Sequence, residues 1–84
     1  VLFPPSPNPF NSTVRLSIYL PREDLVLLSV FDINGREVSR LVNGKVGIGN
    51  QTFVWYASGF PAGVYIVRMY AGDVSKMMKV VLVR

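Results

Sequence analysis

The chain contains no cysteine and no histidine among its 84 residues. Without cysteine it has neither a disulfide nor a thiolate nucleophile. Without histidine it lacks a Ser-His-Asp triad, a frequent zinc ligand and the usual proton carrier near neutral pH. We therefore expect a protein that binds, supports or addresses other molecules. We do not expect an enzyme, a cofactor or a metal site.

Carboxylates are also scarce, and their positions do not suggest catalysis. Glycosidase chemistry needs two carboxyl groups across a cleft, one of them desolvated. Glu23 and Asp24 are neighbours in a charged turn, and Asp32 and Asp73 stand beside glycine turns, where aspartate commonly forms the turn. The sequence therefore predicts no catalytic pair and no calcium cluster.

Neither the charge nor the hydropathy pattern points to a nucleic acid or a membrane. The net charge is +4, but the nine lysines and arginines are scattered and form no basic arm. No apolar run approaches the ~20 residues of a membrane helix. The glycine-rich segment 44–49 is followed by a predicted strand, whereas a phosphate-binding loop leads into a helix. We expect no nucleic-acid partner and no membrane insertion.

The first twelve residues form a proline-rich segment, with Pro4, Pro5, Pro7 and Pro9 close together. Proline fixes φ and lacks an N–H donor, so this arm is predicted to be extended or turn-like. We expect residues 1–12 to be a linker and residues 13–84 to be the folded domain. The chain begins at Val1 rather than methionine, so we expect it to be a segment of a longer protein.

From Thr13 onward, short apolar segments alternate with turn residues, which predicts an all-β fold. Strands are expected over 13–20, 25–31, 36–42, 51–56, 64–70 and 74–83. Turns are predicted at Asn34-Gly35, at Asn43-Gly44 and around Gly72, with a loop over 45–50. This spacing favours a small immunoglobulin-like antiparallel β-sandwich of about seven strands.

Three of the predicted strands carry further information. The segment 25–31 is apolar on both faces, as a central strand is. In 36–42, the spacing of Val38 and Leu41 indicates either a bulge or a short helical turn. The last strand is also apolar on both faces, so either it is central or it keeps a face or an edge for a partner. A weak homodimer through that strand stays open.

Tyr65 occupies the position of a tyrosine corner. It follows Gly63-Val64 at the start of a predicted strand, and Val67 stands where immunoglobulin domains usually have a cysteine. The alternative is that Tyr65 is an ordinary strand aromatic. Elsewhere, exposed aromatic rings allow a sugar-stacking platform, although cross-strand pairs are the commoner role of such residues. The candidates for that platform are Tyr19, Tyr56, Phe60 and Tyr70.

Taken together, the motifs resemble those of the type A C-terminal sorting domain of type IX secretion cargo proteins. The resemblance covers nearly the whole chain, from Pro5 to Arg84. Its structural motif residues are Pro7, Asn8, Pro9, Phe10, Gly35, Arg36, Trp55 and Gly72. A flagellar hook-capping immunoglobulin-like domain shares part of the pattern.

The resemblance implies a non-catalytic address at the end of an exported protein. Its implied partners are the upstream cargo domain, the type IX translocon and shuttle proteins, and a sortase-like surface peptidase that cleaves near or before the arm. The implied location is the cell surface or the extracellular space, reached through the periplasm. The residues expected to meet these partners are Gly63, Val64, Tyr65, Lys76, Lys79, Val80, Val81, Leu82, Val83 and Arg84. Two alternatives stay open: an accessory carbohydrate-binding or structural module of a secreted hydrolase, and a hook-capping-like assembly domain.

Overall fold

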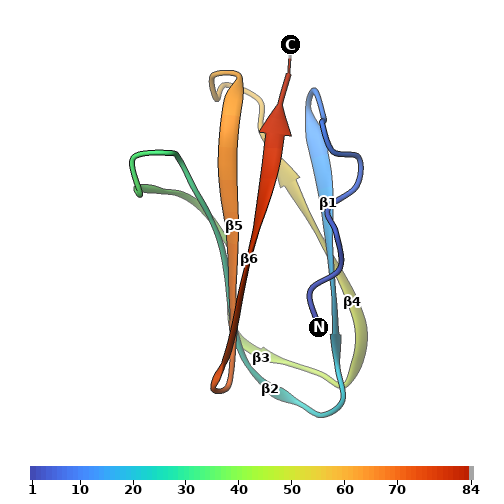
Figure 1. Cartoon of the computed structure of the whole chain (residues 1–84). Helices are drawn as coiled ribbons and strands as arrows, with labels where there is room; N and C mark the ends of the chain where they lie inside the picture. The colour runs from blue at the N-terminus through green and yellow to red at the C-terminus, as the bar shows by residue number, and fades with distance from the viewer. Residues whose placement is uncertain (84) are drawn as a thin grey trace.

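The fold is seen in a computed structural model that describes residues 1–83 (Figure 1). Strands account for the regular structure of these residues, and none of the described residues forms a helix that could cross a membrane. The six strands are β1 (Thr13–Leu20), β2 (Asp24–Phe31), β3 (Glu37–Val46), β4 (Gly49–Tyr56), β5 (Gly63–Ala71) and β6 (Val74–Leu82).

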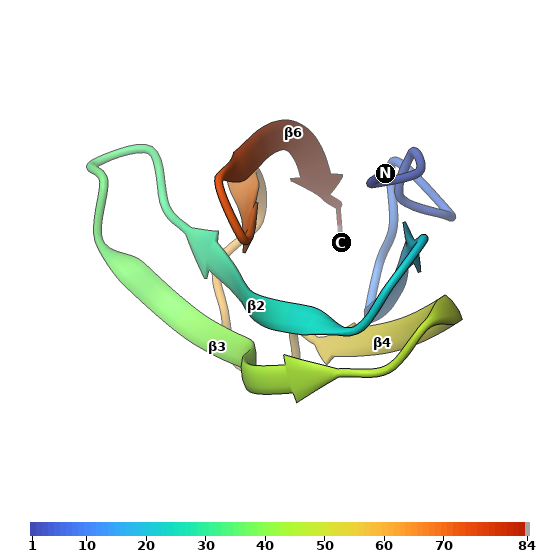
Figure 2. The same ribbon diagram turned by 90° about the horizontal axis from the view of Figure 1, so that it is seen from below.

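The strands form two antiparallel sheets that face each other. One sheet has the order β3-β2-β5-β6, and the other pairs β1 with β4. Seen from below, β6 of the larger sheet and β4 of the smaller sheet lie on opposite sides of the interior (Figure 2). This is the expected all-β immunoglobulin-like sandwich. Residues 1–83 form six strands rather than about seven, and the N-terminal arm lies alongside them.

The core follows directly from the period-two alternation of apolar residues. On β1, Val14, Leu16 and Ile18 are fully buried, and on the facing sheet Leu28 and Val67 are fully buried as well. Each buried aliphatic side chain of this size stabilises the fold by about 1.5–3 kcal/mol relative to its exposed state. Burial of these alternating residues therefore holds the sheets together without a disulfide.

The proline-rich arm lies against both sheets. Leu2 bridges to Ile18 on β1, and Phe10 bridges in parallel to Leu82 on β6. Both arm side chains are at least 95 % buried within the common core, with exposed fractions of 5 % for Leu2 and 2 % for Phe10. The arm therefore combines extended backbone with bends at residues 7–9 and 11–12, within the extended or turn-like form that was predicted, and its apolar residues contribute to the core. The boundary expected between residues 12 and 13 stays a prediction.

The predicted turn at Asn43-Gly44 and the predicted loop over 45–50 are wrong. Asn43 pairs with Leu27 and Gly44 with Val26, so β3 continues to Val46. β4 then begins at Gly49, which leaves a short connection. The long β2 strand supplies backbone partners along this stretch, and these partners outweigh the local turn preference of Asn-Gly.

Two other ambiguities in the sequence are resolved. Register shifts after Leu28 and after Val30 mark an irregularity in the β2–β3 pairing, so the spacing of Val38 and Leu41 reflects a bulge rather than a helical turn. β2 is central, between β3 and β5, as its two apolar faces predicted. β6 lies at the end of its sheet.

Candidate recognition surface

The sandwich contains the tyrosine corner that the sequence indicated. The Tyr65 hydroxyl donates a hydrogen bond to the Pro61 carbonyl over 2.6 Å, and the Tyr65 ring is buried. Val67 faces the core two residues later and is fully buried. This hydrogen bond holds the β4–β5 connection against the start of β5.

Trp55 is the centre of an aromatic cluster beside this corner. Its ring centroid lies 5.6 Å from that of Phe10, 5.5 Å from that of Phe60 and 5.1 Å from that of Tyr65. The rings are tilted or edge-on, the arrangements that aromatic quadrupoles favour. The cluster therefore joins the arm, β4 and β5, and it explains why Phe10 and Trp55 both belong to the sequence pattern.

The turns of the longer sheet are set by glycine and by one aspartate. Gly35 has a φ of +82° in the β2–β3 turn, and Gly72 has a φ of +61° between β5 and β6. The Asp32 carboxylate accepts hydrogen bonds from the backbone N–H groups of Asn34 and Arg36 and pairs with the Arg36 guanidinium at 3.2 Å. The backbone hydrogen bond from Arg36 leads the interactions that lower the pKa of Asp32 below its usual value.

The predicted recognition residues of β6 fall into two groups. Val80 and Leu82 point into the core and are buried, whereas Lys76 and Lys79 are exposed. Val81 is half-buried, Val83 beyond the strand is exposed, and Arg84 lies outside the described residues. Only the exposed side chains can contact a partner directly, while Val80 and Leu82 act through the fold.

Residues 63–65, which were also predicted to contact a partner, lie at the start of β5. Gly63 has a φ of +151°, Val64 is partly exposed, and Val64 pairs with Val81. Tyr65 is buried, so its contribution is the corner rather than a direct contact. The structure therefore places residues 63–65 beside the end of β6, and their role in recognition stays a prediction.

The arm covers part of the free edge of β6. The Asn8 side-chain amide donates to the Lys79 carbonyl over 3.0 Å and accepts from the Val81 N–H over 3.0 Å. Phe10 continues the pairing, donating to the Val81 carbonyl and accepting from Val83. Pro7 and Pro9 flank Asn8, and both follow cis peptide bonds. The backbone edge of β6 at residues 79–83 is therefore covered by the arm, so a strand from another chain cannot pair with it there.

The aromatic residues considered for sugar stacking do not form one platform. Tyr19 and Tyr56 lie on the sheet of β1 and β4, paired with Asn50 at one end and Thr13 at the other. Tyr70 is on β5 in the opposite sheet, and Phe60 stacks within the Trp55 cluster. The geometry gives no support to the carbohydrate-binding alternative.

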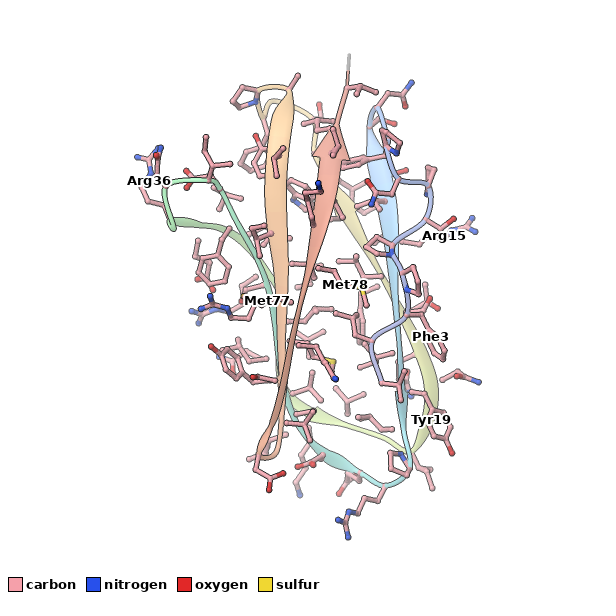
Figure 3. The ribbon with its side chains drawn as sticks, in the orientation of Figure 1. Phe3, Arg15, Tyr19, Arg36, Met77 and Met78 are labelled. Atoms are coloured by element: carbon pink, nitrogen blue, oxygen red, sulfur yellow. The ribbon has the colours of Figure 1, made fainter. Side chains whose placement is uncertain are left out.

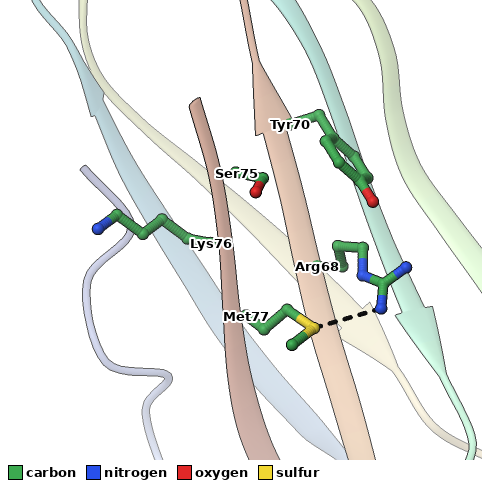
Figure 4. A pocket seen from close by; sticks show the side chains of 5 residues that line it. All are labelled: Arg68, Tyr70, Ser75, Lys76 and Met77. Carbon is green, nitrogen blue, oxygen red and sulfur yellow. Dashed lines mark hydrogen bonds between the residues drawn. The ribbon is translucent and has the colours of Figure 1, made fainter. Parts of the chain in front are cut away.

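A surface that the sequence analysis missed lies on the outer side of β5 and β6. Two shallow hollows share Arg68 and Met77, and one of them is shown in Figure 4. Strand alternation could have located these side chains. Their joint exposure depends on β6 ending its sheet and on the β2–β3 turn projecting away from the sandwich, as Figure 1 shows.

These features define the class of the protein: a small immunoglobulin-like β-sandwich with a tyrosine corner and an arm along the edge of its last strand. Among residues 1–83, no three histidine, cysteine, aspartate or glutamate side chains come together as a metal site would require. The sequence matches the family described as "Secretion system C-terminal sorting domain" over residues 6–83. The chain belongs to this type IX secretion family. A comparison with curated proteins gave no match.

Proposed function

We propose that this domain is a non-catalytic address that directs a cargo protein, attached in cis, through the type IX secretion system. Membership of the sorting-domain family carries the proposal, since the family implies export to the cell surface or beyond and contact with the secretion machinery. The fold supports it physically: a rigid sandwich can present the same surface on cargoes of different shape.

The strand β6 is central to this proposal. Lys79 and Val81 share one face of β6 beside the 63–65 corner, and a translocon or shuttle protein would contact them there together with Val83. Lys76 is exposed on the opposite face of the strand. A sortase-like peptidase would act before the arm, because residues 2–10 are held against β1 and β6 by backbone hydrogen bonds. The cleavage would therefore fall on the cargo side of the arm.

The test is a cargo whose sorting domain ends at Val74, compared with the full domain in a strain that has the secretion system. We expect the truncated protein to stay in the periplasm, and normal secretion of it would overturn the proposal. The truncation also removes the buried residues Val80 and Leu82, so the fold is lost as well.

A second pair of variants separates recognition from folding. Lys76→Gln with Lys79→Gln changes exposed charges and should leave the fold intact. Val80→Asp places an unpaired charge in the core and should unfold the domain. Reduced export of the folded double variant, measured beside its thermal unfolding curve, would show that β6 is contacted directly. Full export of Val80→Asp would show that no folded address is needed.

A further inference from the structure

We propose that the outer side of β5 is a docking surface for an acidic, apolar segment of a protein of the secretion machinery. This inference rests on the proposed function and adds the surface and the chemistry of the partner. We call the surface the β5 trough, and it is formed by Phe31, Ile33, Ile66, Arg68, Tyr70 and Met77.

The trough is continuous, because both hollows share Arg68 and Met77. The hollow beside Phe31 is mainly apolar, whereas the hollow beside Tyr70 is mixed and has Lys76 in its wall. One hollow is lined by residues from β5 and the start of β6, including Tyr70 and Ser75, and the next by Phe31, Ile33 and Ile66. The exposed fractions of its side chains reach 61 % for Met77 and 75 % for Ile33. Adjoining exposed apolar residues of this kind mark interaction sites more often than isolated ones do.

Arg68 lies at the centre of the trough and is held in place without a carboxylate. Its guanidinium carbon is 5.0 Å from the centre of the Phe31 ring, and one of its nitrogens lies 3.3 Å from the Met77 sulfur (Figure 4). A sulfur atom is a weak acceptor, so most of the donor capacity of the guanidinium is unused by these contacts. The side chain is therefore pre-positioned for an incoming carboxylate.

The surrounding charges favour an acidic partner. Within residues 1–83, neither Arg68 nor Lys79, its neighbour on the same face, has an ion-pair partner. The nearby carboxylates are already paired, Asp32 with Arg36 at 3.2 Å and Glu37 with Arg40 at 2.9 Å. If two copies of this chain met trough to trough, Arg68 and Lys79 of one copy would face the cations of the other, so self-association through the trough is disfavoured.

The binding test uses the isotope-labelled chain and two short peptides, one of alternating leucine and glutamate and one of alternating leucine and lysine. We expect the glutamate peptide to shift the amide resonances of Ile66, Arg68 and Met77, and the lysine peptide to leave them in place. Amide resonance shifts confined to β1 and β4, or equal shifts with both peptides, would overturn the proposal. Self-association of the peptide-free chain through the trough would overturn it as well.

The secretion test uses the cargo with Arg68→Glu, and Arg15→Glu on β1 as the matched control. Both variants make the same charge change, and Arg15 lies on the other sheet, where Figure 3 shows it beside β1 and away from Met77. We expect export to fall roughly tenfold or more for Arg68→Glu, because like charges then meet at the interface, and to stay near the wild-type level for Arg15→Glu.

Met77→Glu is the second trough variant, since an exposed side chain is changed and the stacking of Arg68 on Phe31 is kept. Its new carboxylate would neutralise Arg68 and should also lower export. Thermal unfolding checks that both trough variants are folded. If the wild-type domain directs export and both folded variants are exported to the same level, the trough inference fails and the sorting function stands. If the wild-type domain does not direct export, the proposed function itself fails, and the peptide shifts still decide whether the trough binds acidic chains.

Discussion

The side chain of Asn8 binds the backbone on both sides of Val80 in β6, donating to the Lys79 carbonyl and accepting from the Val81 N–H, each over 3.0 Å. An asparagine amide can do this because it carries a donor and an acceptor side by side. The contact joins residues 71 and 73 positions apart in the chain. It ties the proline-rich arm to the strand that we propose as part of the address.

Asn8→Ala should therefore loosen the arm. Two hydrogen bonds are lost at an exposed edge, so we expect a destabilisation of about 1–2 kcal/mol, since water replaces part of each bond. Chemical denaturation measures the loss, and hydrogen exchange at Val81 and Val83 reports the released edge. Asn11→Ala, in the same arm, should change stability by less than about 0.5 kcal/mol. Unchanged hydrogen exchange at Val81 in Asn8→Ala would contradict the claim that the Asn8 side chain holds the arm to β6.

Phe10→Ala tests whether the arm is part of the folding unit. Phe10 is 2 % exposed and contacts Trp55, so we expect a loss of about 3–5 kcal/mol, as for other buried phenylalanines. Phe3→Ala, which changes an arm residue that is 41 % exposed, is the control and should cost much less. Near-wild-type stability of the Phe10 variant would instead support a domain that begins at Thr13.

Tyr65→Phe removes the corner hydrogen bond and keeps the buried ring. Because the Pro61 carbonyl lies on an exposed residue and can be rehydrated, we expect a loss of about 0.5–1.5 kcal/mol. Tyr56→Phe deletes a hydroxyl from a side chain that is 69 % exposed, and it should be neutral. Equal unfolding midpoints for the two variants would show that the corner bond contributes nothing.

Gly72→Ala should destabilise the β5–β6 turn. A methyl group there would meet the Asp24 carboxylate oxygen at 2.7 Å, and a φ of +61° costs an alanine roughly 1–2 kcal/mol. Gly47→Ala is the matched control, since its Cβ would enter open space, and it should be neutral or slightly stabilising. Thermal unfolding of both proteins makes the comparison, and equal destabilisation would refute the assignment of strain to Gly72.

Asp32 should make the stability of the domain pH-dependent at acid pH. Its pKa is lowered in the fold, chiefly by the Arg36 backbone N–H, so its contribution is present above the unfolded pKa of about 4 and is lost as the pH falls through the lowered folded value. Wild type should therefore exceed Asp32→Asn in stability at pH 7, and the gap should narrow as the pH falls below the unfolded pKa and through the lowered folded pKa. A gap independent of pH would contradict the role of the charge.

The sequence predicted the elements that depend on local alternation and missed those that depend on distant partners. The buried faces of β1 and β5 follow from period two, and Tyr65 follows from its place after Gly63. The turn predicted at Asn43-Gly44 is wrong because these residues pair with Leu27 and Val26 of the preceding strand β2, and this pairing overrides the turn preference of Asn-Gly. The hydrogen bonds of Asn8 to β6 and the surroundings of Arg68 depend on β6 lying at the end of its sheet, and no local pattern in the sequence indicates that position.

The central claim, that this domain is sufficient as an address, is tested most directly by fusing residues 1–84 to a periplasm-targeted reporter. The measurement is the fraction of reporter outside the outer membrane, in one strain with the type IX translocon and in an otherwise identical strain without it. We predict export in the first strain and periplasmic retention in the second. Equal reporter fractions outside the cell in the two strains would contradict the account.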